Sequence, residues 1–279
     1  MNTLQNLINE HSLKKRENKE GYIFSLHCII SHVLQIPRLE FHLYLDKKLK
    51  KEEVEVINSL LKRKMNNEPL DYILGERDFY NVKLDIDPSV LIPRNETEQL
   101  VDLIEKRLTN VENKVLVDLC CGSGCIGISL KKKIPSIKVI GVDISDKALD
   151  IAKKNAKKNN VDVTFILGDF LTPLNGMKVD FVVCNPPYIS KEEYLSLPPD
   201  VKNFEPKIAL LADRDGLEYY LRLNEGLNLI LNKGAEVFLE IGYKQGKRIK
   251  EIFSNEKYKD VEIVKDYYGN DRFCFLKNI

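Results

Sequence analysis

The sequence predicts an α/β protein in which a doubly wound, largely parallel sheet follows a small helical bundle. The first observation is that residues 1 to about 66 place apolar side chains at helical spacing and show no alternating strand pattern. The second is that, after residue 110, short apolar runs alternate with helical segments, as is typical of parallel sheets covered by helices. The chain length of 279 residues allows about two domains.

Three helices are expected in the first part of the chain. Apolar residues recur at helical spacing over residues 22–34, and Pro37 ends this run. A short helix is expected around residues 41–45, and another over residues 54–65. We therefore assign residues 1–66 to one helical domain.

Residues 67–94 are expected to form a linker with a hairpin. Several prolines and a glycine interrupt this stretch, which argues against a long helix. Residues 82–86 alternate apolar and polar side chains like a half-buried strand, which favours a hairpin within the linker.

The second domain is expected to span residues 95–279. It begins with a helix, because Asn95 and Glu98 resemble a capping box whose helix continues to Leu108. The expected strands lie at residues 115–119, 139–143, 163–167, 179–184, 236–241 and 272–276, and further helices are expected at residues 146–160 and 216–231.

Composition and charge exclude several kinds of protein. The 43 lysine and arginine residues nearly balance the 42 aspartate and glutamate residues, which argues against a protein that binds mainly the phosphate backbone of nucleic acids. No apolar run approaches the roughly 18 residues needed to span a bilayer, so no membrane association is expected. The first residues lack the basic segment and apolar stretch of a secretory signal.

The six cysteines indicate free thiols. Cys120, Cys121 and Cys125 lie close together, but no pair has the C-x-x-C spacing of many zinc sites. We therefore expect no metal site, and we expect a cytoplasmic location in which thiols stay reduced.

A glycine-rich turn follows the first expected strand of the second domain. Gly122, Gly124 and Gly127 have the spacing G-x-G-x-x-G, in which glycines allow a tight turn and the close approach of a ligand. Asp143 lies nineteen residues after Gly124, at the end of the next strand, where a carboxylate can accept both hydroxyls of a ribose. The pattern fits NAD, FAD or S-adenosylmethionine.

Acidic residues near the turn favour S-adenosylmethionine among these ligands. Asp118 precedes the glycines, where its charge would repel a pyrophosphate and attract the ammonium group of a methionine moiety. After the third strand, Asp169 can accept a hydrogen bond from an adenine amino group, and Phe170 can lie against the ring. Taken alone, Asp169 and Phe170 fit a structural turn with a core aromatic equally well.

The most informative segment is Asn185-Pro186-Pro187-Tyr188, at the end of the fourth expected strand. Its prolines fix the backbone and donate no hydrogen bonds, so the segment is stiff and its carbonyl oxygens are free. The Asn185 side-chain oxygen and one of these carbonyls can each accept a hydrogen from a planar NH2 group, on which Tyr188 can stack. Such an arrangement would orient an amide or exocyclic amine toward a methyl donor, and orientation can contribute roughly 7–11 kcal/mol to catalysis.

These segments are expected at one edge of the sheet, because each follows the carboxyl end of a strand. Further motifs are Pro69-Leu-Asp-Tyr-Ile-Leu-Gly, Leu91-Ile-Pro-Arg-Asn-Glu-Thr-Glu, Asn185-Pro-Pro-Tyr-Ile, Phe204-Glu-Pro-Lys-Ile-Ala-Leu, Glu240-Ile-Gly-Tyr-Lys-Gln-Gly and Asp266-Tyr-Tyr-Gly-Asn-Asp-Arg. In this combination the sequence resembles the release-factor glutamine methyltransferases, the PrmC/HemK family.

The resemblance implies a Rossmann-like class I methyltransferase domain with a seven-stranded, doubly wound sheet. It also implies methyl transfer from S-adenosyl-L-methionine, with S-adenosyl-L-homocysteine as the product. The acceptor would be the side-chain amide nitrogen of the glutamine in the Gly-Gly-Gln motif of peptide-chain release factors. The size of the 1–66 domain and its place before the linker suggest that it helps to bind this protein substrate. The near-neutral charge gives no expectation of direct contact with nucleic acid.

The residue reasoning and the resemblance together assign the site residues. Asn185 is the expected catalytic residue, and Asn185, Pro186, Pro187 and Tyr188 are expected to bind the substrate. The residues expected to contact the cofactor are Cys120, Cys121, Gly122, Ser123, Gly124, Asp143, Asp169, Phe170 and Asn185.

The sequence departs from the family pattern at three positions. Cys120 stands where the family usually has glycine, Cys121 where it has threonine or a small residue, and Asn95 where it commonly has proline. A cysteine at position 120 narrows the backbone angles that are available to the cofactor loop.

Three alternatives stay open on the sequence alone. An amino methyltransferase acting on adenine or cytosine of nucleic acid would use similar chemistry, but it would need a basic groove and a way to flip the base. A dehydrogenase would explain the glycine turn and leave residues 185–188 unexplained. A non-catalytic cofactor-binding module would keep its role in an Asn185→Ala variant.

Overall fold

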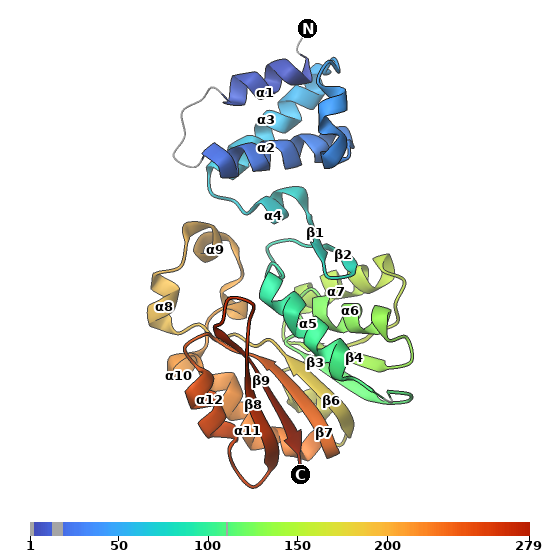
Figure 1. The fold of residues 1–279 in the computed structure, drawn as a ribbon, viewed down its shortest axis with the longest axis vertical. Coiled ribbons are helices and arrows are strands. Elements are labelled where there is room, and N and C mark those ends of the chain that lie inside the picture. The colour runs from blue at the N-terminus through green and yellow to red at the C-terminus, as the bar shows by residue number, and fades with distance from the viewer. Residues whose placement is uncertain (1–2, 13–18, 110) are drawn as a thin grey trace. The chain divides into compact units, whose positions relative to one another are not determined.

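The computed structural model describes residues 3–12, 19–109 and 111–279 of the chain. These residues form two compact units, Met1–Gly75 and Glu76–Ile279 (Figure 1). None of the helices in the described ranges is long and apolar enough to span a membrane. The six cysteines are free thiols, and the described residues contain no cluster of three or more acidic, histidine or cysteine side chains that could bind a metal ion.

The first unit is helical, as the spacing of its apolar residues predicts. It consists of α1 (Leu4–Ser12), α2 (Lys19–Leu34), the 3-10 helix η1 (Arg38–Tyr44), α3 (Lys51–Met65) and α4 (Leu70–Leu74). Leu26, Ile29 and Ile30 of α2 are fully buried, and they share one core with Leu7 of α1 and Ile57 of α3.

Helix α4 extends this unit beyond residue 66, where the sequence analysis ends the helical domain. Ile73 is buried in the core of the bundle, and Leu70 and Leu74 pack against that core. The compact unit therefore ends at Gly75, whose left-handed backbone (φ +72°) terminates α4. A helix of five residues is too short to show a helical period in the sequence.

The hairpin of residues 76–85 opens the second unit and packs against one of its helices. Strands β1 (Glu76–Phe79) and β2 (Val82–Asp85) pair antiparallel. The Asp85 amide donates a hydrogen bond to Asn155 Oδ1 (2.7 Å) on α7 (Asp146–Lys158), and Asn155 Nδ2 donates to the Asp85 carbonyl (3.0 Å). These bonds fasten the hairpin to the helix layer.

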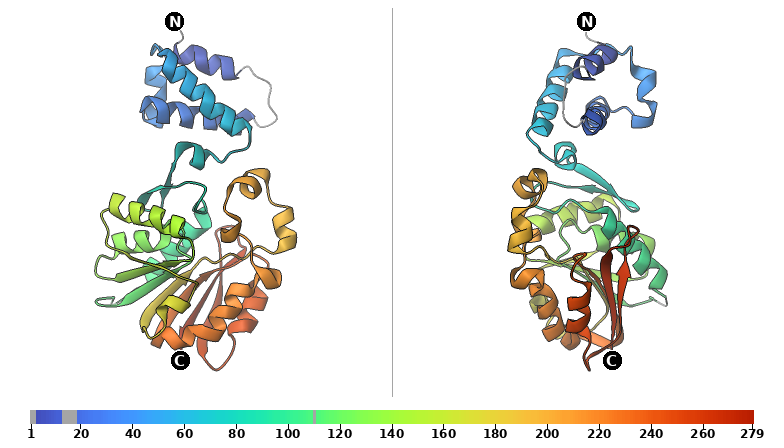
Figure 2. Two further views of the ribbon diagram at one scale, coloured as in Figure 1. Left: turned by 180° about the vertical axis from the view of Figure 1, so that it is seen from behind. Right: turned by 60° about the vertical axis from the view of Figure 1, so that its left-hand side comes forward.

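The second unit contains a seven-stranded sheet of β3 (Val115–Leu119), β4 (Lys138–Asp143), β5 (Thr164–Leu167), β6 (Val179–Cys184), β7 (Leu231–Glu240), β8 (Tyr258–Lys265) and β9 (Asp271–Asn278). Its order is β5-β4-β3-β6-β7-β9-β8, with parallel pairs from β5 to β7 and antiparallel pairs at β9 and β8. Helices cover both faces of this sheet (Figure 2). The predicted doubly wound α/β architecture is therefore confirmed.

Besides α7, the helices of the second unit are α5 (Asn95–Arg107), α6 (Cys125–Lys133), α8 (Lys191–Leu195), α9 (Pro199–Phe204), α10 (Asp213–Gly216), α11 (Glu218–Ile230) and α12 (Gly246–Phe253), with the 3-10 turns η2 (Thr172–Leu174) and η3 (Lys207–Ala209).

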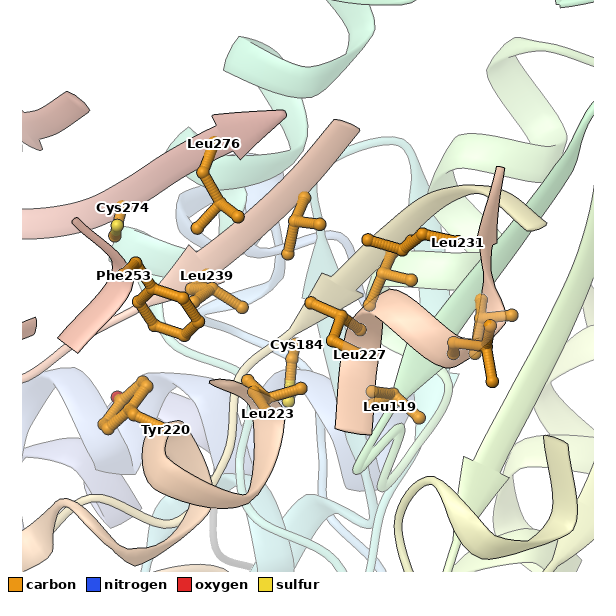
Figure 3. Close-up of a cluster of buried hydrophobic side chains, with 14 of the residues drawn as sticks. Leu119, Cys184, Tyr220, Leu223, Leu227, Leu231, Leu239, Phe253, Cys274 and Leu276 are labelled. Carbon is orange, nitrogen blue, oxygen red and sulfur yellow. The ribbon is translucent and has the colours of Figure 1, made fainter. Parts of the chain in front are cut away.

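One core of the second unit lies between the sheet and the helices α11 and α12. Tyr220 and Leu223 of α11 and Phe253 of α12 pack with Leu239 of β7 in this core (Figure 3). The next residue, Glu240, faces the opposite side of the sheet and meets α5.

The edge of the sheet differs from the sequence expectation. β8 was not among the expected strands, because Tyr258–Lys265 carries charged residues and only part of it is buried. β7 begins at Leu231 rather than at residue 236. The helix expected over 216–231 is present as α11, and Gly216 is the last residue of the short helix α10.

The capping box expected at Asn95 is wrong. Asn95 is the first residue of α5, its N-cap is Arg94, and no side chain caps the helix there. The Asn95 side-chain oxygen instead accepts a hydrogen bond from Arg77 of β1 at 2.8 Å. Glu96 and Glu98 lie in the first turn, where the helix dipole favours negative charge.

Candidate active site

A pocket, called the central pocket below, opens beyond the carboxyl ends of β3, β4, β5 and β6. The strand order changes direction at β3, and doubly wound sheets bind ligands at such a point. The predicted site residues that line the pocket are Cys120, Cys121, Gly122, Ser123, Asp143, Asp169, Phe170, Asn185 and Pro187. Gly124, Pro186 and Tyr188 do not line it.

The loop after β3 turns sharply because several of its residues have left-handed backbones. Cys120 (φ +56°), Gly122 (φ +53°) and Gly124 (φ +77°) all adopt this conformation. A Cβ at Gly124 would come within 2.8 Å of the Ile128 side chain, so this glycine serves the packing of the loop on α6. A Cβ at Gly122 would meet no atom within 4 Å, and the backbone there is open to a ligand.

Asp143 joins the loop to the end of β4. Its Oδ2 accepts a hydrogen bond from the Gly122 amide (2.8 Å), and its Oδ1 accepts one from the Ser145 amide (2.9 Å). Burial raises the pKa of this carboxyl, while the backbone hydrogen bonds act in the opposite direction. Each oxygen keeps a lone pair that a ribose hydroxyl can use.

Asp118 lies under the loop and does not line the central pocket. Its side chain is 1% exposed, and its Oδ2 accepts a hydrogen bond from the Gly127 amide at 2.9 Å. Gly127 allows this approach, since a Cβ there would lie 3.1 Å from the same oxygen. Any influence of Asp118 on a bound ligand therefore passes through the loop rather than through direct contact.

The far wall of the central pocket is aromatic. Phe170 packs edge-on against Tyr219 of α11, with ring centroids 5.3 Å apart. The Arg222 guanidinium lies over the Phe170 ring at 5.0 Å and donates a hydrogen bond to Asp169 Oδ1 at 2.8 Å. Asp169 is thus held by an ion pair at the rim, while Phe170 and Tyr219 offer flat surfaces to an adenine ring.

A second pocket adjoins the central one. It is lined by Pro186, Tyr188 and Glu240, among other residues, and it shares Leu91, Arg94, Asn185 and Ala209 with the central pocket. Asn185 therefore lies between two cavities, one at the glycine loop and one beyond the proline segment. This is the position that a group would need in order to hold an acceptor against a methyl donor.

The residues of the central pocket fit S-adenosylmethionine better than a dinucleotide. Asp143 suits a ribose, and the Phe170 and Tyr219 rings suit an adenine. Among the described residues that line the pocket, Arg94 is the one cation, and it is already paired with Glu205 at 2.5 Å. A pyrophosphate would therefore find no unpaired cationic side chain among these residues.

Sequence reasoning did not single out every lining residue. Thr97 and Ala209 line the central pocket, and the sequence marks them only as parts of the motifs that carry the family resemblance. Tyr219 cannot be recognised from the sequence, because its role depends on how α11 packs beside Phe170. No local pattern in the sequence marks such a residue.

The fold and this pocket define a methyltransferase domain, and comparisons with known proteins agree. Residues 95–196 match the family model described as the methyltransferase small domain, and residues 10–75 match the PrmC N-terminal domain. A release factor glutamine methyltransferase from Thermodesulfovibrio yellowstonii is 36% identical, covering 99% of this chain and 97% of its own length. One from Staphylococcus aureus is 36% identical over 88% of each chain. The chain belongs to the release factor glutamine methyltransferase family.

Solved structures of lower identity show the same fold. A methyltransferase from Pyrococcus furiosus has a TM-score of 0.54 at 17% identity, over 79% of this chain and 98% of its own. A T. thermophilus 16S rRNA methyltransferase, solved with AdoMet and guanosine, has a TM-score of 0.53 at 15% identity, over 73% of this chain and 50% of its own. The methyltransferase domain implies a methyl donor of the S-adenosylmethionine type.

Proposed function

We propose that this chain methylates the side-chain amide nitrogen of the glutamine in the Gly-Gly-Gln motif of peptide-chain release factors. The observation that carries the proposal is the position of Asn185, which lines both the central pocket and the second pocket. Full-length relatives named for this activity support the substrate class. Because release factors act on ribosomes, we also propose a cytoplasmic location.

The central pocket would hold S-adenosyl-L-methionine. Asp143 would accept the ribose hydroxyls, Phe170 and Tyr219 would enclose the adenine, and residues 120–123 would line the methionine end. When bound, this cofactor supplies an electrophilic methyl group on a sulfonium and leaves as S-adenosyl-L-homocysteine, and the amide nitrogen releases one proton.

The second pocket would hold the substrate glutamine. Its amide NH2 has two hydrogens, for which Asn185 Oδ1 and a carbonyl of the proline segment are acceptors. No hydrogen bond within the described residues takes up the carbonyl oxygens of Pro186 and Pro187. An amide nitrogen is a weak nucleophile, so its orientation at fixed distance from the methyl group is the main contribution that the protein can make.

The test is to incubate purified enzyme with a release factor and methyl-labelled S-adenosylmethionine. Mass spectrometry of the digested release factor should locate one added methyl group on the Gly-Gly-Gln glutamine. A release factor in which that glutamine is replaced should stay unlabelled. Labelled duplex DNA or RNA beside an unlabelled release factor would instead support a nucleic-acid methyltransferase.

A further inference from the structure

Asn185 is tied to a buried chain of hydrogen bonds. Its Nδ2 donates to Thr97 Oγ1 (3.2 Å) on the first turn of α5, and the Thr97 hydroxyl donates to Glu240 Oε2 (2.7 Å) at the end of β7. Thr97 and Glu240 are 2% and 1% exposed, so water does not compete strongly for these bonds. These hydrogen bonds therefore join the proposed site to α5 and to the end of β7, the strand that pairs with β6.

The carboxylate of Glu240 decides which group donates each of these hydrogen bonds. An ionised carboxylate only accepts hydrogen bonds, so the single proton of the Thr97 hydroxyl is committed to Glu240. Thr97 can then offer only lone pairs to Asn185, and these lone pairs match the NH2 end of the amide. The other end, Oδ1, has no hydrogen bond within the described residues.

Two tyrosines hold Glu240 in place. The Tyr188 hydroxyl donates to Oε1 at 3.4 Å, and the Tyr220 hydroxyl donates to the Glu240 backbone carbonyl at 2.8 Å. The groups that face Glu240 from the neighbouring elements are Glu96 and Thr97 on α5, Cys125 on α6, Tyr188 after β6, Tyr220 on α11, Arg272 on β9 and Arg94 before α5.

We propose that Thr97 and Glu240 are positioning residues that fix the Asn185 amide with its oxygen free to accept a hydrogen from the substrate NH2. This inference rests on the proposed function for the identity of the acceptor. The orientation itself rests on the two hydrogen bonds among Asn185, Thr97 and Glu240 and on the ionised form of Glu240.

Loss of the Glu240 charge would allow the donor and acceptor roles in these two hydrogen bonds to reverse. A protonated carboxyl, or an amide in its place, can donate to Thr97, whose hydroxyl could then donate to Asn185 Oδ1. The amide oxygen would be turned away from the substrate. Burial raises the pKa of Glu240 to about 7, against the opposing effects of the Thr97 hydrogen bond and Arg272, so acidification would favour this reversed chain.

The first experiment compares Thr97→Val with Thr97→Ser. Valine keeps the shape of threonine and removes its hydroxyl, whereas serine keeps the hydroxyl. We expect kcat to fall about 10- to 100-fold in Thr97→Val, with S-adenosylmethionine affinity retained by calorimetry, and to recover in Thr97→Ser. Wild-type kcat in Thr97→Val would overturn the proposal.

A readout independent of activity is the NMR spectrum of protein labelled with ¹⁵N-asparagine. The Asn185 NH2 signals are those that disappear in Asn185→Ala. They should shift in Thr97→Val and stay near their wild-type positions in Thr97→Ser. If they do not move in Thr97→Val, the proposed orientation is wrong even where kcat has fallen.

Glu240→Gln gives a second and separate test. We expect a lower kcat in Glu240→Gln. In the wild type kcat should fall on the acid side of a midpoint near pH 7, and this fall should be absent from the variant's profile of kcat against pH. An unchanged kcat and an unchanged acid limb would overturn the role of Glu240. If Thr97→Val does not bind S-adenosylmethionine, the Glu240→Gln variant tests the proposal in its place. If the wild type itself leaves release factor unmethylated, the proposed function fails, while the NMR comparison still tests the orientation.

Discussion

At the scale of single residues, the buried carboxyl group of Asp118 has a clear energetic consequence. Burial raises its pKa to about 7, although the Gly127 amide donates a hydrogen bond to it. The unfolded chain would titrate this group near its ordinary pKa of about 4. The folded protein therefore holds the proton more tightly, and the resulting stability is complete below about pH 4 and is lost as pH rises through about 7.

Asp118→Asn should make the free energy of unfolding depend less on pH. The amide is similar in shape and does not titrate, so the variant's free energy of unfolding should fall less than that of the wild type between about pH 5 and pH 8. Urea unfolding at both pH values measures the difference. Asp162→Asn, at an exposed loop position, should keep the wild-type dependence. Parallel curves for all three proteins would argue against this account of Asp118.

The site residues that sequence reasoning finds are those that directly follow strands. Asp143 and Asn185 can be located this way, because strand ends are visible as the ends of apolar runs. The role of Glu240 is not visible, because it depends on a hydrogen bond to Thr97, which is 143 residues away in the chain. The charge of Asp118 is visible in the sequence, but the burial that keeps it out of the pocket is not.

At the scale of elements, Gly216 allows α10 to pack against the segment that follows β6. Its backbone is left-handed (φ +79°), and a Cβ there would lie 2.1 Å from the Tyr188 carbonyl oxygen. Gln245, at the start of α12, donates through Nε2 to the carbonyls of both Tyr188 (3.1 Å) and Gly216 (3.2 Å). The conformation of residues 185–188, which are expected to bind the substrate, therefore depends on the close approach of Gly216 to the Tyr188 carbonyl.

Gly216→Ala should destabilise the protein by more than the left-handed backbone alone accounts for. Gly234 is the matched control, since its backbone is also left-handed (φ +74°) but a Cβ there meets no atom within 4 Å. We expect Gly234→Ala to cost about 1–2 kcal/mol and Gly216→Ala to cost at least about 1 kcal/mol more, because the carbonyl of Tyr188 must move. Urea unfolding of both variants checks this; equal losses would count against the packing argument.

The elements that the sequence predicts well are the buried parallel strands. β3, β4 and β6 are short apolar runs with little ambiguity. β8 escapes prediction because an edge strand with one exposed face tolerates charged residues. The capping interaction expected for α5 is absent from the structure, because the Asn95 side-chain oxygen accepts a hydrogen bond from Arg77 instead.

At the scale of the whole molecule, the chain divides into two compact units whose boundary is at Gly75. The sequence predicts a boundary at residue 66, because prolines and a very short helix obscure the packing of Ile73 on the helical bundle. The lining of the central pocket comes entirely from the second unit. We therefore propose that the first unit contributes to binding the release factor and not to binding the cofactor.

A chain of residues 76–279 tests this division of roles. We expect it to bind S-adenosylmethionine with nearly full-length affinity by calorimetry. Its KM for release factor should rise by about tenfold or more, equivalent to a loss of about 1.4 kcal/mol of binding. Calorimetric binding of the cofactor also serves as the control for folding. An unchanged KM would exclude a substrate-binding role for the first unit.

The most direct test of the account is Asn185→Ala, measured for cofactor binding and for methyl transfer in parallel. We expect S-adenosylmethionine affinity to stay close to that of the wild type and transfer to release factor to fall by about 100-fold, because the acceptor amide loses its orienting oxygen. Asn175→Ala, at an exposed position outside both pockets, should change neither quantity. Wild-type transfer by Asn185→Ala would contradict the account.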